Sequence, residues 1–261
     1  MPDAHRPHDG RYDFRPAGLA DPGLLPQFPD AGPGDVATAS WPFLRLAVPH
    51  VWRTDARHRS PFQTGLISTE EALILHNVAR GFAGARALEI GCHFGWSTAH
   101  LVAAGLDLDV VDPALADEAR RAWVEASLAR AAAPGTPIPR LWPGFSPDIL
   151  GTVAATDRRP FSFVFIDGNH EGDAPRQDAV AVQPFCAETA VVMFHDLTSP
   201  HVAAGLAAMR DAGWNTGIYE TMQIMGLAWR GQVEPLLTQR DQAVPQSPAH
   251  LDGFRRLDRA I

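Results

Sequence analysis

Polar side chains follow two apolar segments of the sequence, and their types and spacing could support metal binding or acid–base chemistry. The first segment ends in I-D-G-N-H at residues 166–170, and the second ends in F-H-D at residues 194–196. If the two segments are adjacent parallel strands, their carboxyl ends meet, and Asp167, His195 and Asp196 come close together. Two carboxylates and an imidazole can share one divalent cation. Without such a partner, burying these carboxylates would be costly.

His170 follows Asp167 by three residues and would lie beside that cation. The pKa of an imidazole is naturally near neutrality, which suits His170 to take a proton from a substrate hydroxyl group. A single histidine is more often structural than catalytic, and the sequence leaves both roles open. We take His170 as the candidate general base because it lies next to two acids at strand ends.

A glycine-containing segment, E-I-G-C-H-F-G-W-S-T at residues 89–98, follows the first predicted strand of the main domain. Gly91 and Gly95 would let the backbone turn tightly against a ligand and expose the amides of a helix N-terminus. The segment departs from the G-x-G-x-x-G dinucleotide fingerprint, because C-H-F separates the two glycines and no third glycine is in register. A tight turn that binds nothing remains the alternative.

The next two strand ends also carry polar groups. Asp112 ends L-D-V-V-D, and a carboxylate at this position can accept both hydroxyls of a ribose. Asp107 and Asp109 precede or interrupt that apolar run, and we expect them to be solvated. P-G-F-S at residues 143–146 places Phe145 and Ser146 where they could flank an adenine, although a simple turn fits equally well.

Strands and helices must alternate to position these groups. Ser68 and Glu71 form a predicted capping box before a helix. Beyond it, apolar runs alternate with helical patterns, which predicts a doubly wound, mostly parallel α/β sheet covered on both faces. The last two runs lie almost end to end and predict an antiparallel hairpin at the sheet edge. The predicted strands cover residues 87–91, 108–112, 137–142, 161–167, 189–196, 215–221 and 223–230, and the helices between them cover 97–105, 116–133 and 172–185.

Composition excludes several classes of protein. The chain has 261 residues, is 46% hydrophobic and carries a net charge of -8, which indicates a globular protein and argues against non-specific nucleic-acid binding. The sequence has no Lys, which excludes Schiff-base, P-loop and Tyr-x-x-x-Lys chemistry. Two cysteines cannot build a disulfide scaffold or a four-cysteine zinc site. With neither a signal peptide nor a membrane span in the sequence, we expect a soluble cytoplasmic protein.

The two ends of the chain differ from its centre. We expect residues 1–60 to form an irregular arm or lid, residues 61–231 to form the main domain, and residues 232–261 to form a polar extension ending in a short helix. The extension could mediate self-association, so a homo-oligomer is possible. Part of the arm should dock on the main domain or on a partner, because it contains Trp41, Phe43, Leu44, Leu46, Val51 and Trp52.

Taken together, these motifs resemble class I S-adenosylmethionine (SAM)-dependent methyltransferases. They are most similar to the branch that contains metal-dependent macrolide sugar O-methyltransferases and cephalosporin-hydroxylase-like proteins. The resemblance implies a Rossmann-like, seven-stranded mixed sheet with six parallel strands and one antiparallel edge strand. It covers about residues 62–230 and rests on G-L-I-S-T-E-E-A, A-L-E-I-G-C-H-F-G-W-S-T, V-V-D-P, F-V-F-I-D-G-N-H and V-V-M-F-H-D.

The resemblance also implies roles for individual residues. SAM would be the cofactor, with Asp112 on its ribose and Ser146 near its adenine. The methionine part would lie against Glu89, Gly91 and Gly95, and Ser97 and Asp167 would also contact the cofactor.

In this branch an aspartate and a later acidic pair bind magnesium, which corresponds here to Asp167, His195 and Asp196. His195 departs from the pattern, since the relatives carry a carboxylate there. The change makes manganese, iron or no metal more plausible than in those relatives. His170 and Asp167 would be the catalytic residues.

The function that we expect is metal-assisted O-methylation of a hydroxylated small molecule, such as a secondary metabolite or a sugar moiety. An Arg-only, Pro-rich chain suits an enzyme of bacterial secondary metabolism. Three alternatives remain open: a SAM pocket used for N- or C-methylation or for a hydroxylase-like or cyclase-like reaction, a nicotinamide-dependent oxidoreductase, and a binding protein without catalysis.

Overall fold

The computed structural model describes most of the chain from Ser60 onwards and shorter segments before it. For residues 31–33, 50–55 and 60–66 it describes the backbone alone. Among the described residues, no helix is long and apolar enough to span a bilayer. The described ranges are 14–24, 31–33, 50–55, 60–133, 135–241 and 248–259.

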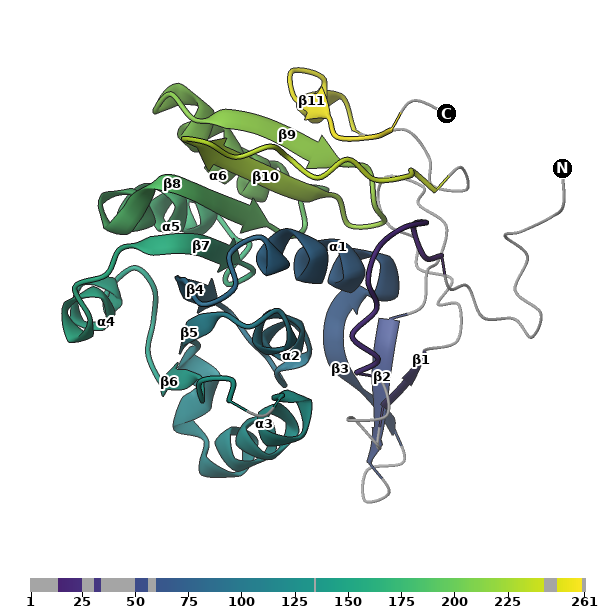
Figure 1. Ribbon diagram of the computed structural model, residues 1–261, viewed down its shortest axis with the longest axis vertical. Helices are drawn as coiled ribbons and strands as arrows, with labels where there is room; N and C mark the ends of the chain where they lie inside the picture. Colours follow the sequence, from purple (N-terminus) through teal and green to yellow (C-terminus); the bar gives the residue numbers. More distant parts are fainter. Residues whose placement is uncertain are drawn as a thin grey trace, which may run out of the picture.

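One mixed sheet of eight strands forms the centre of the molecule (Figure 1), in the order β11-β9-β10-β8-β7-β4-β5-β6. Strands β6, β5, β4, β7 and β8 are parallel to one another, whereas β10 is antiparallel to both β8 and β9. This arrangement confirms the Rossmann-like mixed sheet. The strands are β4 (Arg86–Ile90), β5 (Asp107–Val111), β6 (Arg140–Trp142), β7 (Phe161–Ile166), β8 (Cys186–Phe194), β9 (Asn215–Tyr219), β10 (Met225–Arg230) and β11 (Arg255–Arg256).

Two details of the predicted sheet are wrong. The antiparallel strand is not at the edge, because β9 pairs on the outside and β10 folds back between β9 and β8. The sheet also has an eighth strand, β11, which comes from the C-terminal extension and pairs in parallel with β9. The extension contributes Leu257, which is fully buried, and this apolar residue anchors a segment that its overall composition marks as polar.

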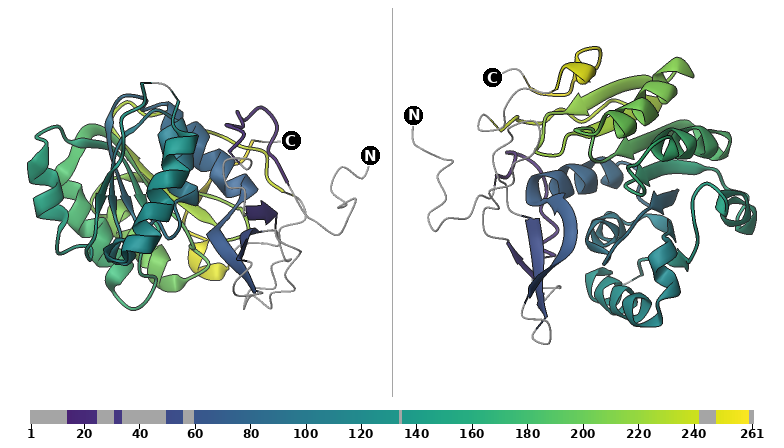
Figure 2. Two further views of the ribbon diagram at one scale, coloured as in Figure 1. Left: turned by 90° about the horizontal axis from the view of Figure 1, so that it is seen from below. Right: turned by 180° about the vertical axis from the view of Figure 1, so that it is seen from behind.

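Helices cover both faces of the sheet (Figure 2). α1 (Thr69–Arg80), α2 (Trp96–Ala103) and α3 (Glu118–Ala131) pack in one apolar cluster, and α4 (Leu150–Thr156), α5 (Ala174–Val182) and α6 (Pro200–Asp211) pack in the other. Strand β4 shows how the sheet divides them, since Ala87 faces the first cluster while Leu88 and Ile90 face the second. Alternate side chains of a strand point to opposite faces, so both faces are buried.

The predicted capping box at the start of α1 is confirmed. The Ser68 hydroxyl accepts from the backbone N–H of Glu71 at 3.2 Å, and the Glu71 carboxylate accepts from the backbone N–H of Ser68 at 2.8 Å. The helices α4 and α6 were not expected. Neither has a side-chain hydrogen bond that caps its N-terminus.

The prediction of an irregular N-terminal arm is wrong in part. β1 (Ala31–Pro33), β2 (His50–Asp55) and β3 (Ser60–Ser68) form a separate antiparallel sheet in the order β1-β2-β3. Residues 14–24 dock on α1, where the Asn77 side chain bonds the backbone N–H and carbonyl of Ala20 at 2.9 and 2.8 Å. The side chains of Trp41, Phe43, Leu44, Leu46, Val51 and Trp52 lie outside the described residues.

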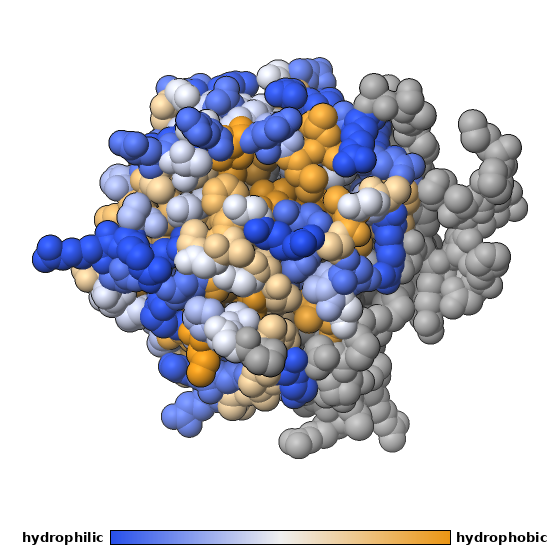
Figure 3. Space-filling model, viewed as in Figure 1, coloured by the Kyte–Doolittle hydropathy of each residue, from blue (hydrophilic) through white to orange (hydrophobic). Residues whose placement is uncertain are grey.

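The C-terminal extension packs against its own domain, beside β9 (Figure 1). Glu220 is buried just after β9 and pairs with Arg240 at 2.8 Å and with Arg256 at 3.1 Å. One carboxylate of the main domain therefore binds two separate parts of the C-terminal extension. On the face of the molecule seen in Figure 1, hydrophilic side chains surround smaller apolar areas (Figure 3).

Candidate active site

A cavity of about 540 Å³ opens at the carboxyl ends of β4, β5, β6 and β7. Doubly wound sheets bind ligands at this position, and the volume lies within the range of about 300–1,000 Å³ that is usual for small-molecule sites. Of the predicted cofactor residues, the cavity wall contains Gly91, Ser97, Asp112, Ser146 and Asp167. Glu89 and Gly95 are not part of the wall.

Both glycines of the β4–α2 loop have backbone conformations that favour glycine, with φ of 87° at Gly91 and 86° at Gly95. A Cβ atom on Gly91 would collide with the backbone carbonyl of Asp167, and one on Gly95 would lie 3.3 Å from a methyl group of Val124 in α3. Close packing of the chain against itself therefore requires these two glycines. Only Gly91 also borders the cavity.

Asp112 lies at the carboxyl end of β5 and borders the cavity, as predicted. Its Oδ2 accepts from the backbone N–H groups of Cys92 and His93 at 2.9 and 3.0 Å, and its Oδ1 accepts from Ala114 at 2.7 Å. The carboxylate thus holds the β4–α2 loop in place. Because a carboxylate offers about four lone-pair positions, Asp112 can still accept a hydrogen bond from a ligand.

Glu89 lies beneath the cavity, on β4, and is fully buried. Burial raises the pKa of Glu89 to about 8, so its side chain is largely protonated at neutral pH. The Ser97 hydroxyl, which borders the cavity, donates to Glu89 Oε1 at 2.6 Å. Glu89 therefore supports the wall of the cavity from below and does not line it.

The loop after β6 forms another wall. Phe145 lines the cavity and is 67% exposed, which leaves its ring open to a planar ligand. The Ser146 hydroxyl donates to Asp178 Oδ1 at 2.6 Å, and burial raises the pKa of Asp178. The sequence did not point to Asp178, because a single aspartate within a helical pattern carries no signal of a site.

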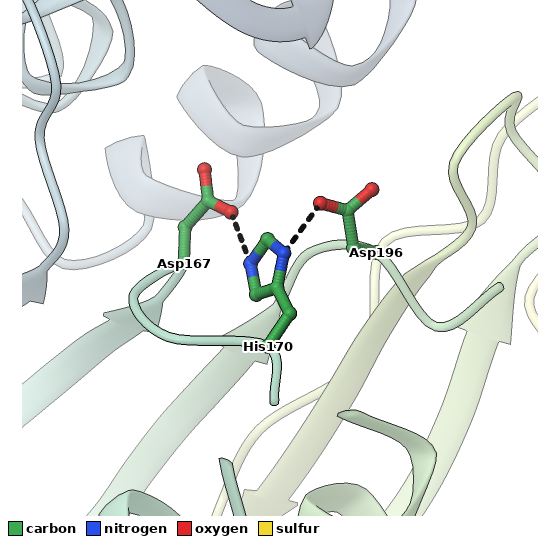
Figure 4. A group of neighbouring side chains, drawn as sticks. All are labelled: Asp167, His170 and Asp196. Carbon is green, nitrogen blue, oxygen red and sulfur yellow. Dashed lines mark hydrogen bonds and ion pairs between the residues drawn. The ribbon is translucent and has the colours of Figure 1, made fainter. Parts of the chain in front are cut away.

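Asp167 and His170 line the cavity and lie beside Asp196 (Figure 4), and ligand atoms of the three residues lie within 4.8 Å of one another. The His170 ring lies between the two carboxylates, with Nε2 3.3 Å from Asp167 and Nδ1 3.1 Å from Asp196. Burial lowers the pKa of His170, but the hydrogen bond to Asp167 and the charge of Asp196 outweigh it and raise the pKa. Asp196 has φ of 64°, a conformation that is uncommon outside glycine.

His195 is fully buried beside this cluster, so the structure brings the predicted trio together. Its Nδ1 lies 3.3 Å from Asp167 Oδ1 and 3.5 Å from Asp196 Oδ2. Burial lowers the pKa of His195, but the carboxylates around it outweigh burial and raise the pKa well above its ordinary value. The two histidines in turn hold the pKa of Asp167 well below its usual range, against the effect of burial.

Glu71 is the third acid of this cluster, and the sequence identified it only as a helix cap. Its Oε2 lies 3.3 Å from Nε2 of His195. Burial raises the pKa of Glu71, but the charge of His195 and several hydrogen bonds outweigh it and lower the pKa to about 2. The spacing of Glu71 and His195 in the sequence gives no hint of this contact.

The expectation that Asp107 and Asp109 are solvated is wrong. Asp109 is fully buried and pairs with Arg86 at 3.0 Å and with Arg140 at 2.7 Å. Asp107 pairs with Arg140 at 2.7 Å and also with Arg159. Asp107 begins β5, opposite the end where the cavity lies, so these carboxylates are structural.

A family model described as a methyltransferase domain matches part of this chain. Residues 88–197 match that domain. They include the β4–α2 loop, Asp112 and the Asp167–Asp196 cluster, which are the elements that surround the cavity. No curated protein matches the sequence.

Solved structures of O-methyltransferases are similar in fold. One is an O-methyltransferase from Bacillus cereus in complex with S-adenosylhomocysteine, 15% identical over 63% of this chain and 82% of that chain, with a TM-score of 0.51. Another is the O-methyltransferase TomG from Streptomyces achromogenes, involved in tomaymycin synthesis and solved in complex with SAM. It is 21% identical over 63% of this chain and 82% of that chain, with a TM-score of 0.50. The chain therefore shares its fold with these two O-methyltransferases.

Proposed function

We propose that the protein is a SAM-dependent methyltransferase that methylates a hydroxyl group of a small molecule. The observation that carries the proposal is that the proposed cofactor-binding residues and part of the acid–histidine cluster line the same cavity. Gly91, Ser97 and Asp112 lie in its wall, and so do Asp167 and His170 of the acid–histidine cluster. The methyltransferase-domain match at residues 88–197 and the fold support the same function.

In this proposal the cofactor occupies the wall formed by the loops after β4, β5 and β6. Asp112 accepts from the ribose hydroxyls, and the adenine lies near Phe145 and Ser146. The methionine part lies against Gly91 and Ser97. The methyltransferase domain spans residues 61–231, with residues 14–24 of the arm and the C-terminal extension docked on it.

The residues of the cluster fit a divalent cation. Among the described residues, Asp196 Oδ1 and both ring nitrogens of His195 are buried without a hydrogen-bond partner. Nε2 lies 3.3 Å from Glu71, whereas Asp196 Oδ1 and Nδ1 belong to side chains that face Asp167 and His170. Unsatisfied buried polar atoms are costly, and a cation would satisfy the latter two. The set mixes carboxylate and imidazole donors, so we propose manganese or iron ahead of magnesium.

His170 is the proposed general base. A bound cation would lower the pKa of a substrate hydroxyl, and bound SAM would supply an electrophilic methyl group. A cation held by Asp167 and Asp196 would counter the charges that raise the pKa of His170, which favours the neutral imidazole. The hydroxyl proton then passes to His170, and the oxygen becomes free to take the methyl group, with S-adenosylhomocysteine as the leaving group. His170 must exchange one of its two carboxylate contacts for the substrate, and Asp167 and Asp196 hold its ring in place through the other.

Calorimetric titration with S-adenosylhomocysteine, with NADH as the control ligand, tests this proposal. We expect micromolar binding of S-adenosylhomocysteine, no binding of NADH, and a loss of at least about tenfold in affinity for Asp112→Ala. Repeating the titration after chelation and with manganese or magnesium separates the cofactor site from the metal site. Folded protein that binds NADH and not S-adenosylhomocysteine would favour an oxidoreductase instead.

A second candidate follows from the replacement of a carboxylate by His195. Two imidazoles and two carboxylates also suit an iron-dependent reaction in the same pocket, such as a hydroxylation. Oxygen consumption that depends on added ferrous iron would favour it over methyl transfer. The acceptor class, cytoplasmic location and role in bacterial secondary metabolism stay predictions.

A further inference from the structure

Glu71 joins three parts of the molecule through one fully buried carboxylate. Its Oε2 accepts from the backbone N–H of Ser68 at the start of α1, at 2.8 Å. Its Oε1 accepts from the Thr221 hydroxyl at 2.9 Å and from the backbone N–H of Gln223 at 2.8 Å, in the turn between β9 and β10. The third part is His195, whose Nε2 lies 3.3 Å from Oε2. Three hydrogen bonds thus fix the carboxylate before it meets the imidazole.

The two nitrogens of His195 face different surroundings. Nε2 faces Glu71, whereas Nδ1 faces Asp167 and Asp196 at 3.3 and 3.5 Å. Carboxylates flank both nitrogens, so the geometry without a cation favours a proton on each. A cation held by Asp167 and Asp196 would displace the proton from Nδ1 and take its lone pair, and Glu71 would then hold the remaining proton on Nε2.

We infer that Glu71 is the positioning residue of the metal site, holding His195 with its proton on Nε2 and Nδ1 free to bind the cation between Asp167 and Asp196. This inference rests on the proposed metal-assisted function. Glu71 takes the place of the carboxylate that commonly accepts a hydrogen bond from a metal-bound histidine. Because the same carboxylate caps α1 and holds the β9–β10 turn, the site is linked to both elements.

A purely structural role for Glu71 explains less of the geometry. A capping box requires the contact between Oε2 and the backbone of Ser68 and nothing more. It accounts neither for the bonds from Oε1 to the β9–β10 turn nor for the approach of His195. Variants that remove each contact separately can therefore distinguish the two roles.

The test measures the affinity of the full chain for Mn²⁺ by calorimetry, in Glu71→Gln and two control variants. In Glu71→Gln we expect the amide to donate to Nε2 of His195, which moves the ring proton to Nδ1 and weakens Mn²⁺ binding about 10- to 100-fold. Ser68→Ala removes the hydroxyl cap, and Thr221→Val removes one bond to Oε1. Both leave His195 facing Glu71, so their Mn²⁺ affinity should stay within about twofold of wild type.

A double-mutant cycle shows whether Glu71 acts through His195. Adding Glu71→Gln to His195→Ala should cause no further loss of Mn²⁺ affinity. Equal Mn²⁺ affinity of Glu71→Gln and wild type, or an equal loss in Ser68→Ala, would overturn the inference and leave the proposed function intact. Wild-type protein that binds S-adenosylhomocysteine but neither Mn²⁺ nor Mg²⁺ would overturn the metal site itself.

A measurement on unmutated protein keeps the test independent of folding in the variants. In Zn²⁺-loaded protein labelled with ¹⁵N-histidine, we expect the NMR spectrum to show His195 protonated on Nε2. A proton on Nδ1 would contradict the inference.

Discussion

Glu89 shows how one residue can link the cofactor loop to the stability of the protein. Its carboxyl group is fully buried under Ser97, and burial raises its pKa from 4.5 to about 8. At a pH between these two pKa values, Glu89 keeps its proton in the folded protein but has released it in the unfolded chain. The free energy of unfolding of the wild type should therefore fall as the pH rises through this window.

Glu89→Gln removes that titration and should become more stable relative to the wild type as the pH rises. The difference in unfolding free energy should grow by at most about 1.4 kcal/mol per pH unit and level off above about pH 8. Urea unfolding of both proteins at about pH 5, 7 and 9 measures it. A difference that stays constant with pH would show that Glu89 is ionised in the folded protein.

At the residue scale, the sequence predicted groups at strand ends and missed groups that depend on distant contacts. Asp167, His195 and Asp196 could be predicted because parallel strands end at one edge of the sheet. Glu71 and Asp178 could not, since each lies within a helix and meets its partner only after the chain has folded.

At the scale of elements, a buried arginine joins two strands and a helix. Arg86 begins β4, pairs with Asp109 of β5 at 3.0 Å, and donates to carbonyl groups at the end of α4, including Val153 at 2.7 Å. Cationic groups at a helix C-terminus satisfy carbonyls that lack a partner within the helix. This network fastens α4 to the sheet although the helix has no side-chain cap of its own at its N-terminus.

Asp109→Asn should destabilise the protein by about 3–5 kcal/mol, because it leaves the buried Arg86 guanidinium without its charged partner. Glu125→Gln is the matched control. It breaks the exposed pair of Glu125 with Arg121 in α3, and it should change the unfolding free energy by less than about 1 kcal/mol. Both effects are measured by urea unfolding. Equal effects of the two substitutions would show that the Asp109 network contributes no more than a surface pair.

The sequence identified most of the alternating strands and helices because these have a clear period or a long apolar run, but it missed α4, α6 and β11. The prediction that Asp107 and Asp109 are solvated was wrong because it assumed that a charged side chain within a strand faces solvent. The arginines that neutralise these aspartates come from β4, β6 and the segment before β7. Such pairing depends on strand order, which charge pattern alone does not reveal.

At the scale of the whole molecule, the C-terminal extension completes the sheet. It adds β11 to β9, and Leu257 of the extension joins the core on the α1–α3 side. The extension also covers what would otherwise be an open strand edge. The pairing of the extension with the sheet could not be predicted from its sequence, because its composition is mostly polar and few of its described residues are apolar and buried.

Leu257→Ala should destabilise the protein by about 2–5 kcal/mol, as expected for a buried leucine that leaves a cavity. Leu257 does not border the ligand cavity, so the affinity for S-adenosylhomocysteine should stay unchanged. Thermal unfolding and calorimetry measure the two effects. A loss of affinity together with an unchanged unfolding temperature would contradict this separation of the extension from the site.

A crystal structure of the protein with S-adenosylhomocysteine tests the central claim most directly. We predict that the ligand fills the cavity at the strand ends, with its ribose hydroxyls on Asp112, its adenine beside Phe145 and its sulfur on the side of His170. Crystals grown at saturating ligand concentration in which the ligand lies elsewhere, or makes no contact with Asp112, would contradict the account.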